Sequence, residues 1–200
     1  MRLFVAVLPP VEAVRELDGA VAPVRRLPGA DRLRWTGPDG WHLTLAFLGE
    51  VPAERLPELE AALAVAVAGH GAHRLRLAGS GRFGDRALWA GVEGDTGALR
   101  QLAGAACGAA AGVVGEGVLG EGGAFRFVPH LTLARTGSPR GGRRAVRGRA
   151  TEELVAFEEA LAGFRGVQWE AAETHLMSSG SAGGFAHYES VRSWPLARRR

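Results

Sequence analysis

A short segment that contains a histidine and a threonine occurs twice in the chain. The sequence His-Leu-Thr-Leu-Ala begins at His42 and again at His130, so Thr44 and Thr132 follow their histidines by two residues. Imidazole titrates near pH 6.5, so one ring can act as a general base while the other acts as a general acid. The threonine hydroxyls are donors suited to an anionic group such as phosphate. The repeat therefore predicts acid–base chemistry at a phosphate ester, if both segments face one cleft.

Both segments have the length and composition of β-strands. Side chains alternate between the two faces of a strand, so His42 and Thr44 point one way while the neighbouring leucines point into a core. Hydrolysis of a cyclic phosphate needs a base for water, an acid for the departing oxygen, and donors for the phosphoryl oxygens. No third ligand with the spacing of a zinc site stands near either segment. We therefore expect no metal and no other cofactor.

The rest of the chain alternates between helix-like and strand-like segments. Apolar residues at helical spacing predict helices over 11–26, 52–68 and 96–114, and Thr151 with two glutamates resembles another helix start. Strand-like runs cover 2–8, 41–48, 75–77, 87–92, 125–133, 168–177 and 186–194, with a loop over 137–149 and a hairpin over 178–184. The pattern predicts an α+β fold with antiparallel sheets. Each motif follows a strand and a helix, which indicates two similar lobes with a shared cleft.

Composition limits the other classes of function. All basic residues are arginines, and a net charge of +3 is a weak argument for general nucleic-acid binding. Arginines gather at 140–149 and 198–200, where they form either a solvated loop and tail or a loose electrostatic surface for a polyanion. One cysteine excludes an intrachain disulfide. The first residues resemble a strand rather than a signal peptide, and no apolar run reaches about 18 residues, so we expect a cytoplasmic protein without a membrane span.

At its two motifs the sequence resembles the 2H phosphoesterases, which are named for a pair of His-x-Thr or His-x-Ser segments. It is most similar to their bacterial and archaeal branch, the RNA 2',3'-cyclic phosphodiesterases, also called the 2'-5' RNA ligase or LigT-like family. The residues that carry the resemblance are Arg2–Ala6, Arg34–Trp35, His42–Val51, Leu88–Val92, Phe127–Arg135, Tyr188–Glu189 and Trp194–Leu196. One such motif is a weak signal, whereas two of them within these flanks are specific.

The resemblance implies a single domain over residues 1–200 that ends in an arginine tail at 197–200. It implies a bilobal fold in which two antiparallel β-sheets with flanking helices are related by a pseudo-twofold axis. The motifs at 42–45 and 130–133 then face the cleft between the lobes.

The resemblance also implies a reaction and a role for each motif residue. The reaction is the hydrolysis of a 2',3'-cyclic phosphate at an RNA end, for example on a tRNA-like fragment, to a 2'-phosphate. His42 is the general acid for the 3' oxygen and His130 the general base for water, while Thr44 and Thr132 bind the phosphate. Run backwards, the same steps join a cyclic phosphate to a 5'-hydroxyl as a 2'-5' linkage.

Three further residues are candidates for the site. The family favours an arginine near Arg135, which is therefore a candidate phosphate ligand, although alternation puts it on the strand face opposite His130 unless the strand bends. Phe47 and Phe127 stand beside the motifs, and stacking on aromatic rings is a common way to hold unpaired RNA bases. Burial in the core is the alternative for both phenylalanines.

Other functions are compatible with the same residues. The motifs contact only the phosphate, so the substrate can also be a cyclic-phosphate nucleotide metabolite or a 2'-5' oligonucleotide. A non-catalytic protein that binds RNA ends predicts affinity that survives loss of both histidines. We expect no membrane association and no obligate protein partner.

Overall fold

The computed structural model describes residues 1–115, 127–136, 147–182 and 185–198. The strands are β1 (Arg2–Val7), β2 (Leu33–Trp35), β3 (Leu43–Glu50), β4 (His73–Phe83), β5 (Ala87–Gly94), β6 (His130–Thr136), β7 (Trp169–Ala171), β8 (Glu173–Ala182) and β9 (Phe185–Pro195). The α-helices are α1 (Val11–Val24), α2 (Leu56–Ala68), α3 (Thr96–Val114) and α4 (Arg147–Leu161). Single 3-10 turns cover Ala30–Arg32, Pro38–Gly40 and Ala53–Arg55.

The strands form a nine-stranded sheet in the order β7-β4-β5-β6-β3-β1-β8-β9, with β2 paired to β6. Every pairing between these strands is antiparallel. The predicted α+β fold with antiparallel strands is confirmed. The two sheets expected from the sequence are joined into one, because Leu43 of β3 pairs with Leu131 of β6 in the middle of the order. The pseudo-twofold axis stays a prediction.

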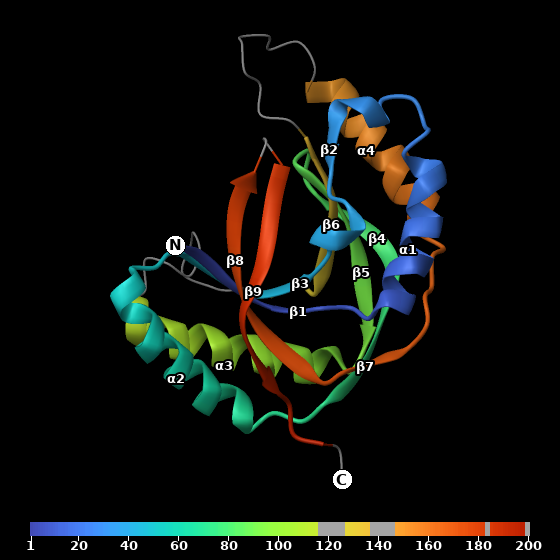
Figure 1. The fold of residues 1–200 in the computed structure, drawn as a ribbon. Coiled ribbons are helices and arrows are strands. Elements are labelled where there is room, and N and C mark those ends of the chain that lie inside the picture. The colour runs from blue at the N-terminus through green and yellow to red at the C-terminus, as the bar shows by residue number, and fades with distance from the viewer. Residues whose placement is uncertain (116–126, 137–146, 183–184, 199–200) are drawn as a thin grey trace.

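The helices lie in two pairs outside the sheet, with α2 and α3 at the lower left of Figure 1 and α1 and α4 at its right. α2 packs against α3, which contacts β3 and β4. α1 packs against α4, which contacts β4 and β5. The leucines of both motif strands are buried in the core, so the polar faces of the same strands are the ones left for a cleft.

Apolar residues at helical spacing explain why these helices form and where they pack. α3 spans Thr96–Val114, the range predicted from its alanine-rich pattern. α1 buries Leu17 and Val21, and α2 buries Leu59 and Leu63, each pair four residues apart on one face. Each of these leucines contributes about 1.5–3 kcal/mol by leaving water. Within the described part of the chain, no helix is both long and apolar enough to cross a membrane.

Two boundaries near the second motif differ from the sequence prediction. α4 begins at Arg147, inside the predicted 137–149 loop and before Thr151, because arginine and alanine are good helix formers and one glycine costs only about 1 kcal/mol. Residues 137–146 of that loop lie outside the described residues. β6 begins at His130 because the preceding Pro129 has no N–H to donate to a neighbouring strand.

The predicted hairpin over 178–184 is also shorter than expected. β8 continues to Ala182, and β9 begins at Phe185. Ser179 pairs with Tyr188 in the part of the ladder between these two strands that follows a register shift at Met177. The strands are therefore long enough to place Ser179 and Tyr188 near the motifs.

Candidate active site

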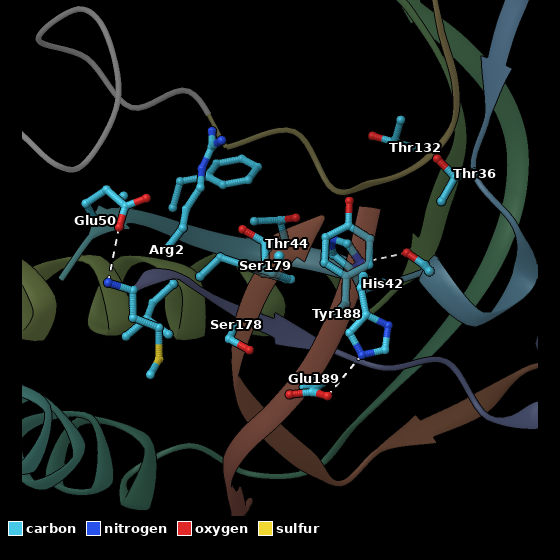
Figure 2. A pocket seen from close by; sticks show the side chains of 18 of the residues that line it. Arg2, Thr36, His42, Thr44, Glu50, Thr132, Ser178, Ser179, Tyr188 and Glu189 are labelled. Carbon is cyan, nitrogen blue, oxygen red and sulfur yellow. Dashed lines mark hydrogen bonds and ion pairs between the residues drawn. The ribbon is translucent and has the colours of Figure 1, made fainter. Parts of the chain in front are cut away.

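The two motifs line one cleft of about 950 Å³. His42, Thr44, His130 and Thr132 all contribute to its wall, and each is half-buried. The structure thus brings the four predicted motif side chains together, although the two segments are far apart in the sequence. Figure 2 shows His42 and Thr44 on one side of this cleft and Thr132 on the other.

A β-bulge interrupts the alternation of side chains in the first motif. Val5 of β1 pairs with Ala46, and the next residue, Ala6, pairs with Thr44. Leu45 is therefore the extra residue on β3. Both Leu45 and Ala46 are buried, so the strand turns two consecutive side chains toward the core.

The second motif contains the same bulge at the equivalent residue. Leu88 of β5 pairs with Ala134, and the next residue, Trp89, pairs with Thr132. Leu133 is the extra residue on β6, and it and Ala134 are both buried. The two copies of the motif therefore agree in backbone geometry as well as in sequence.

The bulges return the fifth residue after each histidine to the cleft, because they shift the alternation by one position. Phe47 and Arg135 occupy these equivalent positions, and both line the cleft. Strict alternation would put Arg135 on the strand face opposite His130. The bulge at Leu133 instead turns Arg135 toward the cleft, where a phosphate ligand must lie. Phe47 is 56% exposed, whereas Phe127 is 9% exposed, packs in the core and does not line the cleft. The structure therefore leaves Phe127 without access to a base.

Both imidazoles are oriented by a backbone carbonyl two residues earlier. Nδ1 of His42 lies 2.8 Å from the oxygen of Gly40, and Nδ1 of His130 lies 2.7 Å from the oxygen of Val128. A carbonyl oxygen only accepts hydrogen bonds, so each neutral ring carries its proton on Nδ1 and donates it there. Nε2 of each ring then has a free lone pair with which to accept a proton.

Each imidazole also packs against two aromatic rings. The pairs are Phe4 and Tyr188 beside His42, and Phe83 and Trp89 beside His130. Ring centroids lie 4.7 Å apart for Phe4 and His42, and 4.8 Å apart for Phe83 and His130. These contacts fix the ring planes and remove water from one side of each imidazole.

Burial lowers the pKa of both histidines. The pKa of His42 falls to about 4, because burial outweighs the hydrogen bond to Gly40 and because the positive charges of His130 and Arg135 add to the effect. Burial, with a smaller contribution from Arg135, also lowers the pKa of His130. Both rings are therefore neutral near pH 7 when no anion lies between them. An anion between them favours their protonated forms and raises both pKa values.

Sequence reasoning missed one wall of the cleft, which the β8–β9 hairpin supplies. Ser178, Ser179, Tyr188 and Glu189 line it, and Figure 2 shows Ser179 beside Thr44, with Ser178 and Glu189 below. The hairpin reaches the site because β8 pairs with β1. The one sequence signal was the pair Tyr188–Glu189, which contributed to the family resemblance without an assigned role.

The two ends of the cleft differ in charge. Arg2 and Glu50 stand at one end in Figure 2, and Thr36 lies with Thr132 at the other. The carboxylate of Glu50 is 3.1 Å from the amino group of Met1, so its charge is partly neutralised.

Across the described ranges, no group of three or more His, Cys, Asp or Glu side chains is arranged to hold a metal ion.

Comparisons with known proteins identify the family to which this fold and sequence are similar. The model of the family described as LigT like Phosphoesterase matches residues 7–92, which include the first motif. A curated RNA 2',3'-cyclic phosphodiesterase of Thermus thermophilus is 35% identical over 181 residues, which cover 85% of this chain and 82% of the relative.

Solved structures share the fold over nearly the whole chain. A structure of a Thermus thermophilus protein superimposes with a TM-score of 0.74 at 26% identity and covers 100% of both chains. Escherichia coli LigT, solved with ATP, gives a TM-score of 0.71 at 27% identity and covers 98% of both chains. With this likeness along its length and both motifs in one cleft, the chain belongs to the LigT-like phosphoesterase family.

Proposed function

We propose that this protein hydrolyses a 2',3'-cyclic phosphate at the end of an RNA and leaves a 2'-phosphate. The observation that carries the proposal is the meeting of two equivalent histidine–threonine pairs in one cleft. The Thermus thermophilus relative is named an RNA 2',3'-cyclic phosphodiesterase. Escherichia coli LigT has been solved with phosphate and with 3'-AMP, which supports a phosphate ligand for a cleft of this fold.

In the proposed reaction each imidazole works through Nε2. His130 takes a proton from water, and the water oxygen attacks phosphorus. The bond from phosphorus to the 3' oxygen breaks, and protonated His42 gives its Nε2 proton to that oxygen. The hydrogen bond from Nδ1 of His42 to Gly40 persists in both protonation states and keeps the ring in place. The negative charge of the bound phosphate favours the protonated form of His42 that the step needs.

Four residues of the cleft bind the substrate in this proposal. Thr44 and Thr132 donate hydrogen bonds to the non-bridging phosphoryl oxygens, and the guanidinium of Arg135 neutralises part of their charge. The backbone of Arg135 belongs to the β-ladder, whereas its guanidinium makes no hydrogen bond or ion pair with a described residue and lines the cleft, where it can donate to a ligand. The exposed ring of Phe47 offers a surface on which the terminal base stacks.

The same groups can run the reaction in reverse. A 5'-hydroxyl then takes the place of water, His130 accepts its proton, and a 2'-5' linkage forms. Because water is far more concentrated than RNA ends, hydrolysis is the main direction that we propose.

The test is product analysis on a short RNA that ends in a 2',3'-cyclic phosphate, with EDTA present and 31P NMR as the readout. The wild-type protein is expected to form the 2'-phosphate alone. His42→Gln and His130→Gln are each expected to lower kcat by about 10²- to 10⁴-fold. Thr132→Val is expected to raise KM, and Thr132→Ser, which keeps the hydroxyl, to preserve it.

His175 provides a matched control. It lies on β8, contacts Ser190 at 3.2 Å and does not line the cleft. His175→Gln is expected to keep activity within about twofold, because a surface hydrogen bond of this kind contributes little. No turnover by the wild-type protein, or full activity after loss of either motif histidine, would contradict the proposed function.

A further inference from the structure

Tyr188 is the one tyrosine of the chain and stands in the wall of the proposed active site. It lies on β9, opposite Ser179 of β8, which also lines the cleft. Neither motif contains it, and the reaction described above does not use it.

Two ring contacts and the lack of a side chain at Gly40 determine the position of the Tyr188 ring. Its centroid is 4.9 Å from that of His42, with the planes at 71°, and 5.6 Å from that of Phe4, with the planes at 85°. Phe4 is itself buried, at 3% exposed, and belongs to a small core cluster with Met177. A Cβ atom at Gly40 would lie 3.3 Å from Cε2 of Tyr188, so the absence of a side chain there leaves room for the ring.

The hydroxyl of Tyr188 has no hydrogen bond to any described residue. Tyr188 lines the cleft, and Figure 2 shows its hydroxyl at the upper end of the ring, toward the part of the picture in which Thr132 lies. A phenolic hydroxyl is a good donor, and one held in place beside a phosphate loses little entropy when it donates. Its natural acceptor in this cleft is a phosphoryl oxygen.

The second imidazole has no such neighbour among the described residues. The rings beside His130 are Phe83 and Trp89, and the indole Nε1 of Trp89 is buried without a hydrogen-bond partner. The two halves of the site therefore match in their motifs but differ in their aromatic neighbours. One half presents an extra donor to the ligand, and the other does not.

We propose that Tyr188 is a further catalytic residue, whose hydroxyl donates a hydrogen bond to a non-bridging phosphoryl oxygen on the His42 side of the cleft. The inference rests on the proposed function, because it needs a phosphate ester between the two imidazoles. The ring of Tyr188 has a second task, which is to hold the imidazole of His42 edge-on.

The test compares Tyr188→Phe, which removes only the hydroxyl, with Tyr188→Leu, which also removes the ring. Tyr188→Phe is expected to lower kcat for the cyclic phosphate by about 10- to 100-fold, because one donor to a developing phosphoryl charge is lost. Tyr188→Leu is expected to be slower again, because His42 loses one of its two aromatic neighbours. Ser190→Ala is the matched control: it removes a hydroxyl from the same strand outside the cleft and is expected to keep wild-type activity.

A binding measurement makes the test independent of turnover. The affinity for inorganic phosphate, measured by calorimetry, is expected to fall by about 10-fold in Tyr188→Phe, since a hydrogen bond to a charged group is lost. Wild-type kcat together with wild-type phosphate affinity in Tyr188→Phe would overturn the role of Tyr188 and leave the proposed function intact. If the wild-type protein does not hydrolyse the RNA end, the proposed function fails, and an unchanged phosphate affinity in Tyr188→Phe would then overturn the role of Tyr188 as well.

Discussion

Leu43 of the first motif lies directly opposite Leu131 of the second, where β3 meets β6. Both leucines are almost completely buried, at 1% and 0% exposed. Each follows its motif histidine by one residue, so the pairing of the leucines brings His42 and His130 to one cleft. The pairing of β3 with β6 therefore has two consequences: it packs the two leucines in the core, and it places the two histidines in the cleft.

Removal of the charge at Arg135 is expected to shift the pH dependence of kcat/KM upward. Its positive charge lowers the pKa of both His42 and His130. The acid limb reports protonation of the base, and the alkaline limb reports loss of the proton from the acid. Both limbs are expected below pH 6.5 in the wild-type protein, because both pKa values are lowered. Arg135→Gln is expected to move both limbs to higher pH and to lower kcat/KM by about 10- to 100-fold.

The control for this prediction is Arg135→Lys, which keeps the charge and is expected to keep the wild-type pH limbs. The profile is measured with the cyclic-phosphate RNA from acidic to mildly alkaline pH, and thermal melts identify the range in which each variant stays folded. Limbs in Arg135→Gln that coincide with those of the wild-type protein would show that its charge does not act on the imidazoles.

Phe47→Ala is expected to weaken recognition of the base without changing the chemistry. Stacking on an aromatic ring contributes about 1–3 kcal/mol per base, so kcat/KM for the RNA end is expected to fall by about 5- to 150-fold. Hydrolysis of ribose 2',3'-cyclic phosphate, which has no base, is expected to stay at the wild-type rate. Phe47→Trp keeps an aromatic surface and serves as the control. An equal loss on both substrates would assign Phe47 to the phosphate or to the fold instead.

Gly81→Ala is expected to destabilise the protein and to disturb His130. A Cβ atom at this position would lie 2.1 Å from Cη2 of Trp89, and Trp89 packs against both Phe83 and His130. The overpacking is expected to cost about 1–3 kcal/mol of the free energy of unfolding, measured by urea denaturation.

Gly104→Ala on α3 is the matched control for this substitution. Gly104 is exposed, and a Cβ atom there meets nothing within 4 Å. Alanine is the better helix former, so the change is expected to stabilise the protein by about 0.5–1 kcal/mol. The same stability effect at both glycines would refute the close packing inferred around Trp89.

Local sequence signals were sufficient to predict that the two motifs share a cleft and where one helix, α3, begins and ends. The repeated pentapeptide identified His42 and His130, and the spacing of apolar residues gave the bounds of α3. The bulge at Leu133 was not predictable, because it depends on how β6 pairs with β5, and alternation by itself left Arg135 on the wrong face. Tyr188 was missed for a related reason: its position depends on the pairing of β8 with β1, which joins opposite ends of the chain.

In the proposed reaction the two histidines have different tasks in one cleft, with His42 as the acid for the 3' oxygen and His130 as the base for water. The most direct test replaces the bridging 3' oxygen of the cyclic phosphate by sulfur, a leaving group that needs no proton. This substrate is expected to restore most of the rate lost in His42→Gln and none of the rate lost in His130→Gln. Equal rescue of both variants, or rescue of His130→Gln alone, would contradict it.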